Sequence, residues 1–215
     1  MFHRIHHPAA IAAGSTLTIT GDEFHHAARV ARVRAGERIE LFDGAGNAAE
    51  GVVGEVGRDS LSVHVEKSLP SRESTLDLTL AMSIIQLERF ELVLQKATEL
   101  GTRTLIPVVA DRGEVRPERY RGKNERWEKI VLEAVKQSGR SVIPNVEAPM
   151  PLDGVIARGG EILFCDADES PSELPASLLR VTLCIGPEGG WSEREISIAR
   201  EAKCRTFRMG PRRLR

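Results

Sequence analysis

The sequence predicts an α/β protein in two parts: a small β-rich N-terminal domain, followed by a larger domain in which strands alternate with helices. Three observations carry this prediction. Short strand-like runs separated by turn signals fill residues 1–70, regular strand–helix alternation occupies residues 75–215, and residues 68–74 (SLPSRES) between them read as a linker.

The N-terminal part predicts several short strands and one helix. Leu17 and Ile19 alternate in the first strand, and further strands are expected at residues 37–42, 48–56 and 61–66, split by the turn sequences DGAGN and GRDS. Asp22 is the expected N-cap of the helix, in which apolar residues recur at helical spacing. Many short strands around a small core are typical of a compact β-barrel.

The second part begins with a buried strand at residues 76–85. A helix follows, which Gly101 can terminate, and residues 104–109 form the next strand. Five apolar residues at i, i+3, i+4, i+7 and i+8 predict a helix over residues 125–138: Trp127, Ile130, Val131, Ala134 and Val135. The short apolar runs 161–167 and 181–186, with 206–209 as a further candidate, predict strands of a mostly parallel sheet covered on both faces.

Composition is that of an ordinary globular protein, with 41% hydrophobic and 28% charged residues and a net charge of −1. No run approaches the roughly 20 apolar residues of a membrane helix, and MFHRIHHP lacks a signal-peptide core, so a cytoplasmic protein is expected. The three cysteines form no CxxC pair and the paired histidines cannot share one ion from a regular element. Buried thiols and no metal are therefore expected.

Charge is unevenly distributed. Residues 194–215 carry eight Lys or Arg against two Glu, and residues 111–129 carry seven against five acidic residues. Local basic density can attract nucleic-acid phosphates even when net charge is near zero. For residues 111–129 a solvated face with mixed ion pairs is an equal alternative.

The sequence IGPEGGW (residues 185–191) directly follows a predicted strand, where ligands bind in parallel α/β sheets. Ser192 and Glu195 form a capping box for the next helix, and Trp191 and Ile196 stand at staple positions. A loop fixed at both ends can present backbone groups to a small polar ligand, although a tight turn alone also favours glycine. The chain has no GxxxxGK[ST] motif, and Gly44–Gly46 reads as a hairpin turn rather than a dinucleotide fingerprint.

IGPEGGWSEREI (185–196) and MGPRRLR (209–215) resemble motifs of the 16S rRNA uracil-N3 methyltransferase family, within the SPOUT superfamily. Three other segments resemble the same family in the same order: HHAARVARVRAGERIELFDGAG (25–46), KATELGTRTLIPVVADR (96–112) and RWEKIVLEAVKQSGR (126–140). The resemblance spans nearly the whole chain. It departs from the family at Gly113, where Ser or Cys is usual, and at Arg213, where an apolar residue is usual.

The resemblance implies a PUA-like RNA-binding β-barrel over residues 1–70 and a SPOUT-type α/β domain with a deep C-terminal trefoil knot over residues 75–215. It implies a homodimer that uses S-adenosylmethionine, requires no metal and acts on 16S rRNA of the 30S subunit. Family members continue beyond the position of Arg215 into a turn and a helix that pass through the knot. The tail is therefore expected to be truncated here.

Site residues follow from the resemblance. The methyl donor is expected on backbone groups around Phe164, Asp166, Ile185, Gly186, Pro187, Gly189, Gly190, Met209, Gly210 and Leu214. Around the base we expect Arg112, Gln137 and Arg140, with Glu188 as a possible base for the N3 proton. Capping of a helix C-terminus is the alternative role for Gln137 and Arg140, and orientation of the loop is the alternative for Glu188.

For RNA contact the candidates on the first domain are Arg4, His25, His26, Arg29 and Arg32. Arg29 and Arg32 are expected to share one helical face and meet adjacent phosphates, with a solvated surface as the alternative. Two other functions remain open: a non-catalytic RNA-binding or ribosome-assembly protein of the same fold, and a SPOUT enzyme that methylates another RNA position.

Overall fold

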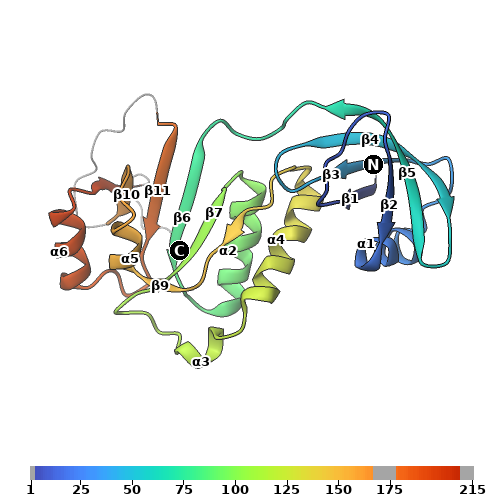
Figure 1. Ribbon diagram of the computed structural model, residues 1–215. Coiled ribbons are helices and arrows are strands. Elements are labelled where there is room, and N and C mark those ends of the chain that lie inside the picture. Colours follow the sequence, from blue (N-terminus) through green and yellow to red (C-terminus); the bar gives the residue numbers. More distant parts are fainter. Residues whose placement is uncertain (1–2, 167–177, 209–215) are drawn as a thin grey trace. The chain divides into compact units, whose positions relative to one another are not determined.

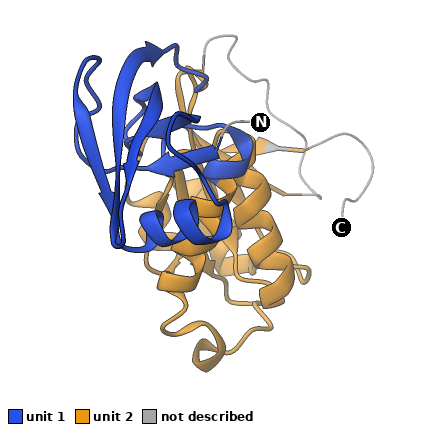
Figure 2. Ribbon diagram, turned by 90° about the vertical axis from the view of Figure 1, so that its right-hand side faces the viewer, with its two compact units in different colours: residues 1–73, 135–143 blue, residues 74–134, 144–215 orange. Residues whose placement is uncertain are grey.

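The computed structural model describes residues 3–166 and 178–208, so the predictions for Met209, Gly210 and Leu214 fall outside the described residues. The chain forms two compact units, residues 1–73 with 135–143 and residues 74–134 with 144–215 (Figure 2). The longer segment of the first unit ends at Glu73, and the first domain was expected to end at residue 70. The sequence did not indicate that residues 135–143, at the end of a helix, belong to the first unit.

The first unit contains a five-stranded sheet in the order β1 (His3–His6), β3 (Arg38–Phe42), β4 (Ala48–Val56), β5 (Ser60–Leu69) and β2 (Thr16–Thr20). β1 pairs with β3 in parallel, and the other neighbours are antiparallel. Ladder irregularities after Glu50 and after Val53 bend β4. At Gly51 an added Cβ would lie 2.8 Å from the carbonyl oxygen of His64, so only glycine permits this close approach of the two strands.

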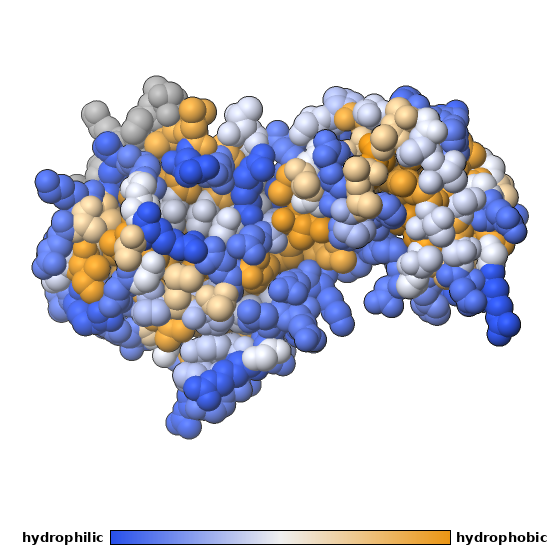
Figure 3. All heavy atoms as spheres, viewed as in Figure 1, coloured by the Kyte–Doolittle hydropathy of each residue, from blue (hydrophilic) through white to orange (hydrophobic). Residues whose placement is uncertain are grey.

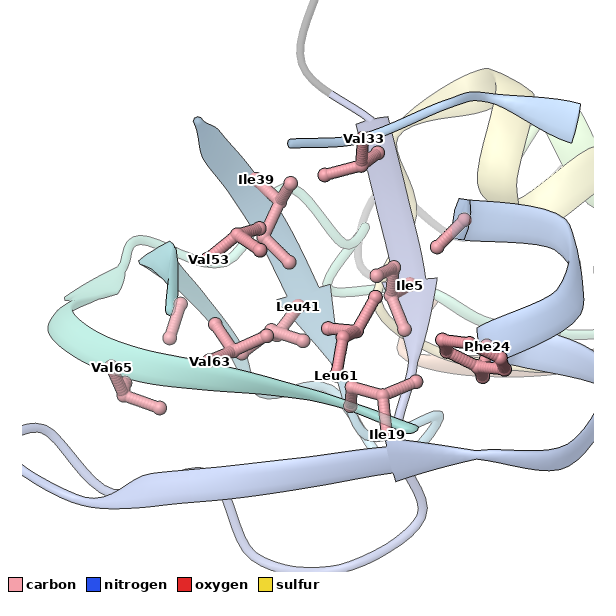
Figure 4. Close-up of a cluster of buried hydrophobic side chains, with 12 residues drawn as sticks. Ile5, Ile19, Phe24, Val33, Ile39, Leu41, Val53, Leu61, Val63 and Val65 are labelled. Atoms are coloured by element: carbon pink, nitrogen blue, oxygen red, sulfur yellow. The ribbon is translucent and has the colours of Figure 1, made fainter. Parts of the chain in front are cut away.

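The strands surround one apolar core (Figure 4). Ile39, Leu41 and Val63 are fully buried, and Phe24 enters the same cluster from the helical segment. Because alternate residues of a strand face opposite sides, these inward positions explain the period-two pattern of the sequence. The predicted strands of this unit are confirmed, and β1 is an addition that its polar sequence HRIH did not signal.

The helical segment of this unit differs from the prediction. It consists of α1 (Gly21–His25) followed directly by one π-helical turn, η1 (His26–Val30). Thr20 is the N-cap, and Asp22 lies inside the first turn, so the predicted cap was wrong. The helix ends at Val30 and Arg32 adopts a left-handed conformation (φ 56°). Arg29 and Arg32 therefore do not share a regular helical face.

A group of buried charges attaches residues 135–143 to the rest of the first unit. Arg140 donates from Nε (3.0 Å) and Nη2 (2.7 Å) to Glu73, and both side chains are about 95% buried, at 6% and 5% exposure. Arg4 donates to the carbonyl oxygens of Val135 (2.7 Å) and Arg140 (2.8 Å) and pairs with Glu40 at 2.9 Å. Residues 68–74 are thus more than the predicted linker, since Glu73 is a fixed part of this unit.

The second unit contains a parallel sheet in the order β12 (Arg205–Phe207), β10 (Ile162–Cys165), β11 (Arg180–Ile185), β6 (Asp77–Ser83), β7 (Thr104–Val109) and β8 (Asn145–Val146) (Figure 1). The short β9 (Met150–Pro151) also pairs with β7 in parallel. The predicted parallel sheet and its main strands are confirmed.

Helices cover both faces of this sheet. On one face Leu152 and Val155 of α5 (Leu152–Ile156) and Ala199 of α6 (Glu193–Glu201) pack with Ile106 and Val108 of β7. The remaining helices are α2 (Leu87–Glu99), α3 (Pro117–Tyr120) and α4 (Asn124–Ser138), of which α2 and α4 were predicted closely.

Phe90 of α2 and Trp127 of α4 are buried against each other with ring centroids 5.1 Å apart. Leu105 faces the side of β7 opposite to Ile106 and is also buried, which confirms that the sheet is covered on both faces. Hydrophilic residues cover much of the surface visible in Figure 3, with patches of hydrophobic residues between them. No helix in the described ranges is long and apolar enough to cross a membrane.

Candidate functional site

The loop after β11 is fixed at its C-terminal end by a capping box, as predicted. The Ser192 hydroxyl accepts a hydrogen bond from the backbone N–H of Glu195 (3.1 Å), and the Glu195 carboxylate accepts one from the N–H of Ser192 (2.8 Å). At the other end β11 is held between β10 and β6 in parallel register. The loop therefore lies at the carboxyl ends of the central strands, where ligands bind in such sheets.

Trp191 folds back under the loop and attaches it to β10. Its indole Nε1 donates to the carbonyl oxygen of Cys165 (3.0 Å), and its ring stacks on Phe164 with centroids 5.0 Å apart and planes at 25°. An added Cβ at Gly186 would stand 2.9 Å from the indole Cε2, so this position needs glycine for a packing reason. The indole thereby fixes both the start of the loop and the end of β10.

The tip of the loop is a tight turn with open space beside it. The N–H of Gly190 donates to the carbonyl oxygen of Pro187 (2.9 Å), and Gly190 has φ +71°, in the left-handed region. Among the residues that the structure describes, a Cβ at Gly190 would meet nothing within 4 Å, and one at Gly189 would meet only Arg112, at 3.6 Å. These described residues leave space beside the outer side of the turn.

The loop after β7 lies against this turn. Arg112 Nη1 donates to the carbonyl oxygen of Gly189 at 3.4 Å, so the structure brings together two residues that the sequence predicted for one site. Asp111 accepts a hydrogen bond from the Ser192 hydroxyl (2.6 Å), and this bond, together with Arg194, lowers the pKa of the Asp111 carboxyl. Asp111 was not among the predicted site residues.

Glu188 stands at the turn, and its side chain is 52% exposed. Arg89 of α2 approaches it with Nη1 3.6 Å from Oε1, a loose surface ion pair. Both roles considered for Glu188, proton acceptor and orientation of the loop, are compatible with this placement. Arg89 is a further basic residue beside the turn, and an exposed arginine in a helix carried no signal that could have identified it.

Phe164 and Asp166 lie at the end of β10 and just after it. Phe164 is 2% exposed as a whole residue and is covered by Trp191, so its side chain is not available to a ligand. Asp166 is partly exposed. The third segment expected around the donor, residues 209–214, falls outside the residues that the structure describes.

Gln137 and Arg140, expected around the base, belong to the first unit rather than to the unit of the loop. Arg140 is 5% exposed, and its guanidinium pairs with Glu73, a contact that neither of the roles considered for it included. Gln137 is exposed. Neither Gln137 nor Arg140 belongs to the unit that contains Gly189 and Arg112.

The RNA-contact candidates fall into two groups. The prediction that Arg4 contacts RNA was wrong. Its guanidinium is almost fully buried and donates to the carbonyl oxygens at the end of α4. His25, His26, Arg29 and Arg32 are exposed on the first unit. They remain candidates, although the left-handed conformation of Arg32 alters the expected spacing.

The cysteines are free thiols in β10, in β11 and before β12. Burial raises the pKa of Cys165 to about 11 and that of Cys184 to about 12, which keeps both thiols protonated and unreactive near neutral pH. Across residues 3–166 and 178–208, no group of three or more His, Cys, Asp or Glu side chains is placed to hold a metal ion.

The family model described as an RNA methyltransferase domain matches residues 72–215, and that of the RNA methyltransferase PUA domain matches residues 19–66. With these matches, the two units and the glycine-rich loop at the carboxyl ends of a parallel sheet place the chain in the class of two-domain RNA methyltransferases.

Named relatives refine this class. Ribosomal RNA small subunit methyltransferase E of Bacillus subtilis is 31% identical over 95% of this chain and 86% of its own length, and that of Synechocystis is 30% identical over 94% and 69%. The chain belongs to the ribosomal RNA small subunit methyltransferase E family.

Two solved structures share the fold over the whole chain. Ribosomal RNA small subunit methyltransferase E of Neisseria gonorrhoeae, solved bound to S-adenosylmethionine, has a TM-score of 0.88 and 29% identity, and the match covers 100% of this chain and 91% of that one. A protein of Legionella pneumophila in complex with the same cofactor has a TM-score of 0.88, 31% identity and coverage of 100% and 92%.

Proposed function

We propose that this protein transfers a methyl group from S-adenosylmethionine to N3 of a uracil in 16S rRNA of the small ribosomal subunit. The observation that carries the proposal is the turn at Gly189 and Gly190, which is held by Trp191, the capping box and Arg112 and which has space beside Gly190 among the described residues. Membership of the family and the cofactor-bound relatives support the same conclusion.

The residues of the turn fit a donor that is recognised through backbone groups. Gly189 and Gly190 have no side chains that would block the approach of a ligand, and the buried Trp191 supports the turn. When bound, S-adenosylmethionine supplies an electrophilic methyl group. Residues 185–190 would hold it, together with the backbone at Phe164 and Asp166 and with residues 209–214.

This chain's own contribution to the reaction is positioning and control of charge. Arg112 is a cation that lies against the turn, and an arginine on a uracil carbonyl would stabilise the negative charge that develops as N3 loses its proton. Glu188 or a water molecule would accept that proton. On the first unit, the exposed His25, His26, Arg29 and Arg32 would contact RNA phosphates.

An rRNA substrate implies a cytoplasmic enzyme, and we infer a homodimer as its active form. Two measurements test the function: calorimetry with S-adenosylmethionine, and transfer of labelled methyl groups to unmodified 30S subunits compared with naked rRNA. The proposal predicts micromolar binding and incorporation. Binding of RNA without incorporation would instead support a non-catalytic RNA-binding protein of the same fold.

A further inference from the structure

The carboxylate of Glu195 joins two loops that are far apart in the sequence. Its Oε2 accepts the N–H of Ser192 (2.8 Å), which completes the capping box, and its Oε1 accepts the N–H of Asp111 (3.0 Å). The side chain lies in the first turn of α6 and is 1% exposed. Helix capping uses only one of the two oxygens, so the second contact requires a separate explanation.

The second contact fixes the peptide group between Ala110 and Asp111, one residue before Arg112. Asp111 is held twice more, because its carboxylate accepts from the Ser192 hydroxyl (2.6 Å) and from Arg194 (3.2 Å). Arg112 then reaches the carbonyl oxygen of Gly189 at 3.4 Å. A hydrogen bond links the Glu195 carboxylate to the Asp111 backbone, and covalent bonds link that backbone to Arg112.

We propose that Glu195 is a positioning residue for methyl transfer, acting through Arg112. The proposal rests on the proposed function. A buried carboxylate is costly unless its oxygens are hydrogen-bonded, and here two backbone N–H groups from two loops satisfy it. These two hydrogen bonds fix the distance between the turn that would hold the donor and the arginine that would meet the base. Small errors in such a distance lower rates strongly.

Two substitutions test whether Glu195 positions Arg112 in addition to capping α6. Glu195→Gln keeps one acceptor and turns an N–H donor toward another backbone donor, so one of the two contacts is lost. Glu195→Asp keeps the charge near the helix N-terminus but is too short to reach both loops. The matched control is Glu193→Gln, an exposed acidic residue of the same helical turn, which loses the same charge without a contact to the β7 loop.

The experiment measures kcat and KM for methyl transfer to 30S subunits, the Kd for S-adenosylmethionine and the exchange rate of the Asp111 amide proton. Both Glu195 variants should lower kcat at least about ten-fold, weaken S-adenosylmethionine binding by a smaller factor than kcat and speed exchange at Asp111, whereas Glu193→Gln should do none of these. If the Glu195→Gln variant does not fold, the same measurements on Glu195→Asp test the proposal.

A double-mutant cycle with Arg112→Ala decides the mechanism. If Glu195 acts through Arg112, Glu195→Asp adds little to the loss of kcat that Arg112→Ala causes alone. Fully additive losses, or a Glu195 variant that behaves as Glu193→Gln does, would overturn the proposal. A wild-type chain that transfers no methyl group would refute the proposed function instead, and exchange at Asp111 would still report whether Glu195 holds the β7 loop.

Discussion

The indole ring of Trp191 lies against the backbone of Gly186, and a Cβ at position 186 would stand 2.9 Å from the indole Cε2. The same ring stacks on Phe164 and donates to the carbonyl oxygen of Cys165. One side chain thus fixes the start of the loop that would bind the methyl donor and the end of a neighbouring strand.

Gly186→Ala should therefore displace the indole. Overpacking of this kind costs about 1–3 kcal/mol, and we expect a lower free energy of unfolding together with at least about ten-fold weaker S-adenosylmethionine binding. Denaturant unfolding and calorimetry measure the two effects. Gly154→Ala is the control, because a Cβ there meets only Met150 at ordinary distances of 3.6 Å or more. Equal behaviour of the two variants would contradict the packing role of Gly186.

Gly190 is required for its conformation rather than for space. With φ +71° and no described atom within 4 Å of an added Cβ, Gly190→Ala should cost about 1–2 kcal/mol of backbone strain, and Gly190→Asn less. Denaturant unfolding of the three proteins gives the order glycine, asparagine, alanine. If alanine is as stable as glycine, the turn does not need the left-handed conformation.

Glu73 should make stability sensitive to acid. Burial would raise the pKa of its carboxyl, but hydrogen bonds from Arg140 and from the N–H groups of Ser141 and Val142 hold that pKa below its usual 4.5. A depressed pKa stabilises the fold above about pH 4.5, and this contribution is lost as pH falls through the lower folded pKa.

Glu73→Gln leaves Arg140 buried without its partner carboxylate, which should cost about 3–5 kcal/mol at pH 7. The difference from the wild type should shrink below about pH 4.5. Unfolding curves from pH 7 to pH 3 test this, with the exposed Glu55→Gln as control. A difference that stays constant over the whole range would contradict the assignment.

RNA binding through the first unit should depend on salt. Arg29→Ala combined with Arg32→Ala should weaken binding to rRNA and lower the slope of log K against log salt by about 0.7–0.9 per lost phosphate contact. Arg58→Ala, at the exposed turn between β4 and β5, is the control. An unchanged slope would show that these arginines face solvent and do not contact RNA phosphates.

The sequence identified elements whose patterns are local. The apolar runs of β7 and β11 and the apolar stripe of α4 agree closely with the structure, because burial on a sheet or helix face imposes period and length. The capping box at Ser192 was also predictable, since its two residues are three positions apart.

Long-range relationships were not predictable. The periodicity of α4 does not show that its last residues join the first unit, and nothing local distinguishes the buried Arg4 from an exposed arginine. Glu195 and Asp111 are 84 positions apart, so their contact is a product of the fold. The site prediction included Arg112 and the loop but not Glu195 and Asp111, which connect them.

The central claim is tested most directly by mapping the modified nucleoside. Unmodified 30S subunits are incubated with the protein and S-adenosylmethionine carrying a labelled methyl group, and the digested rRNA is analysed by mass spectrometry. The account predicts label in 3-methyluridine, reduced at least about ten-fold by Arg112→Ala. No label in the rRNA, or label in a different nucleoside, would contradict it.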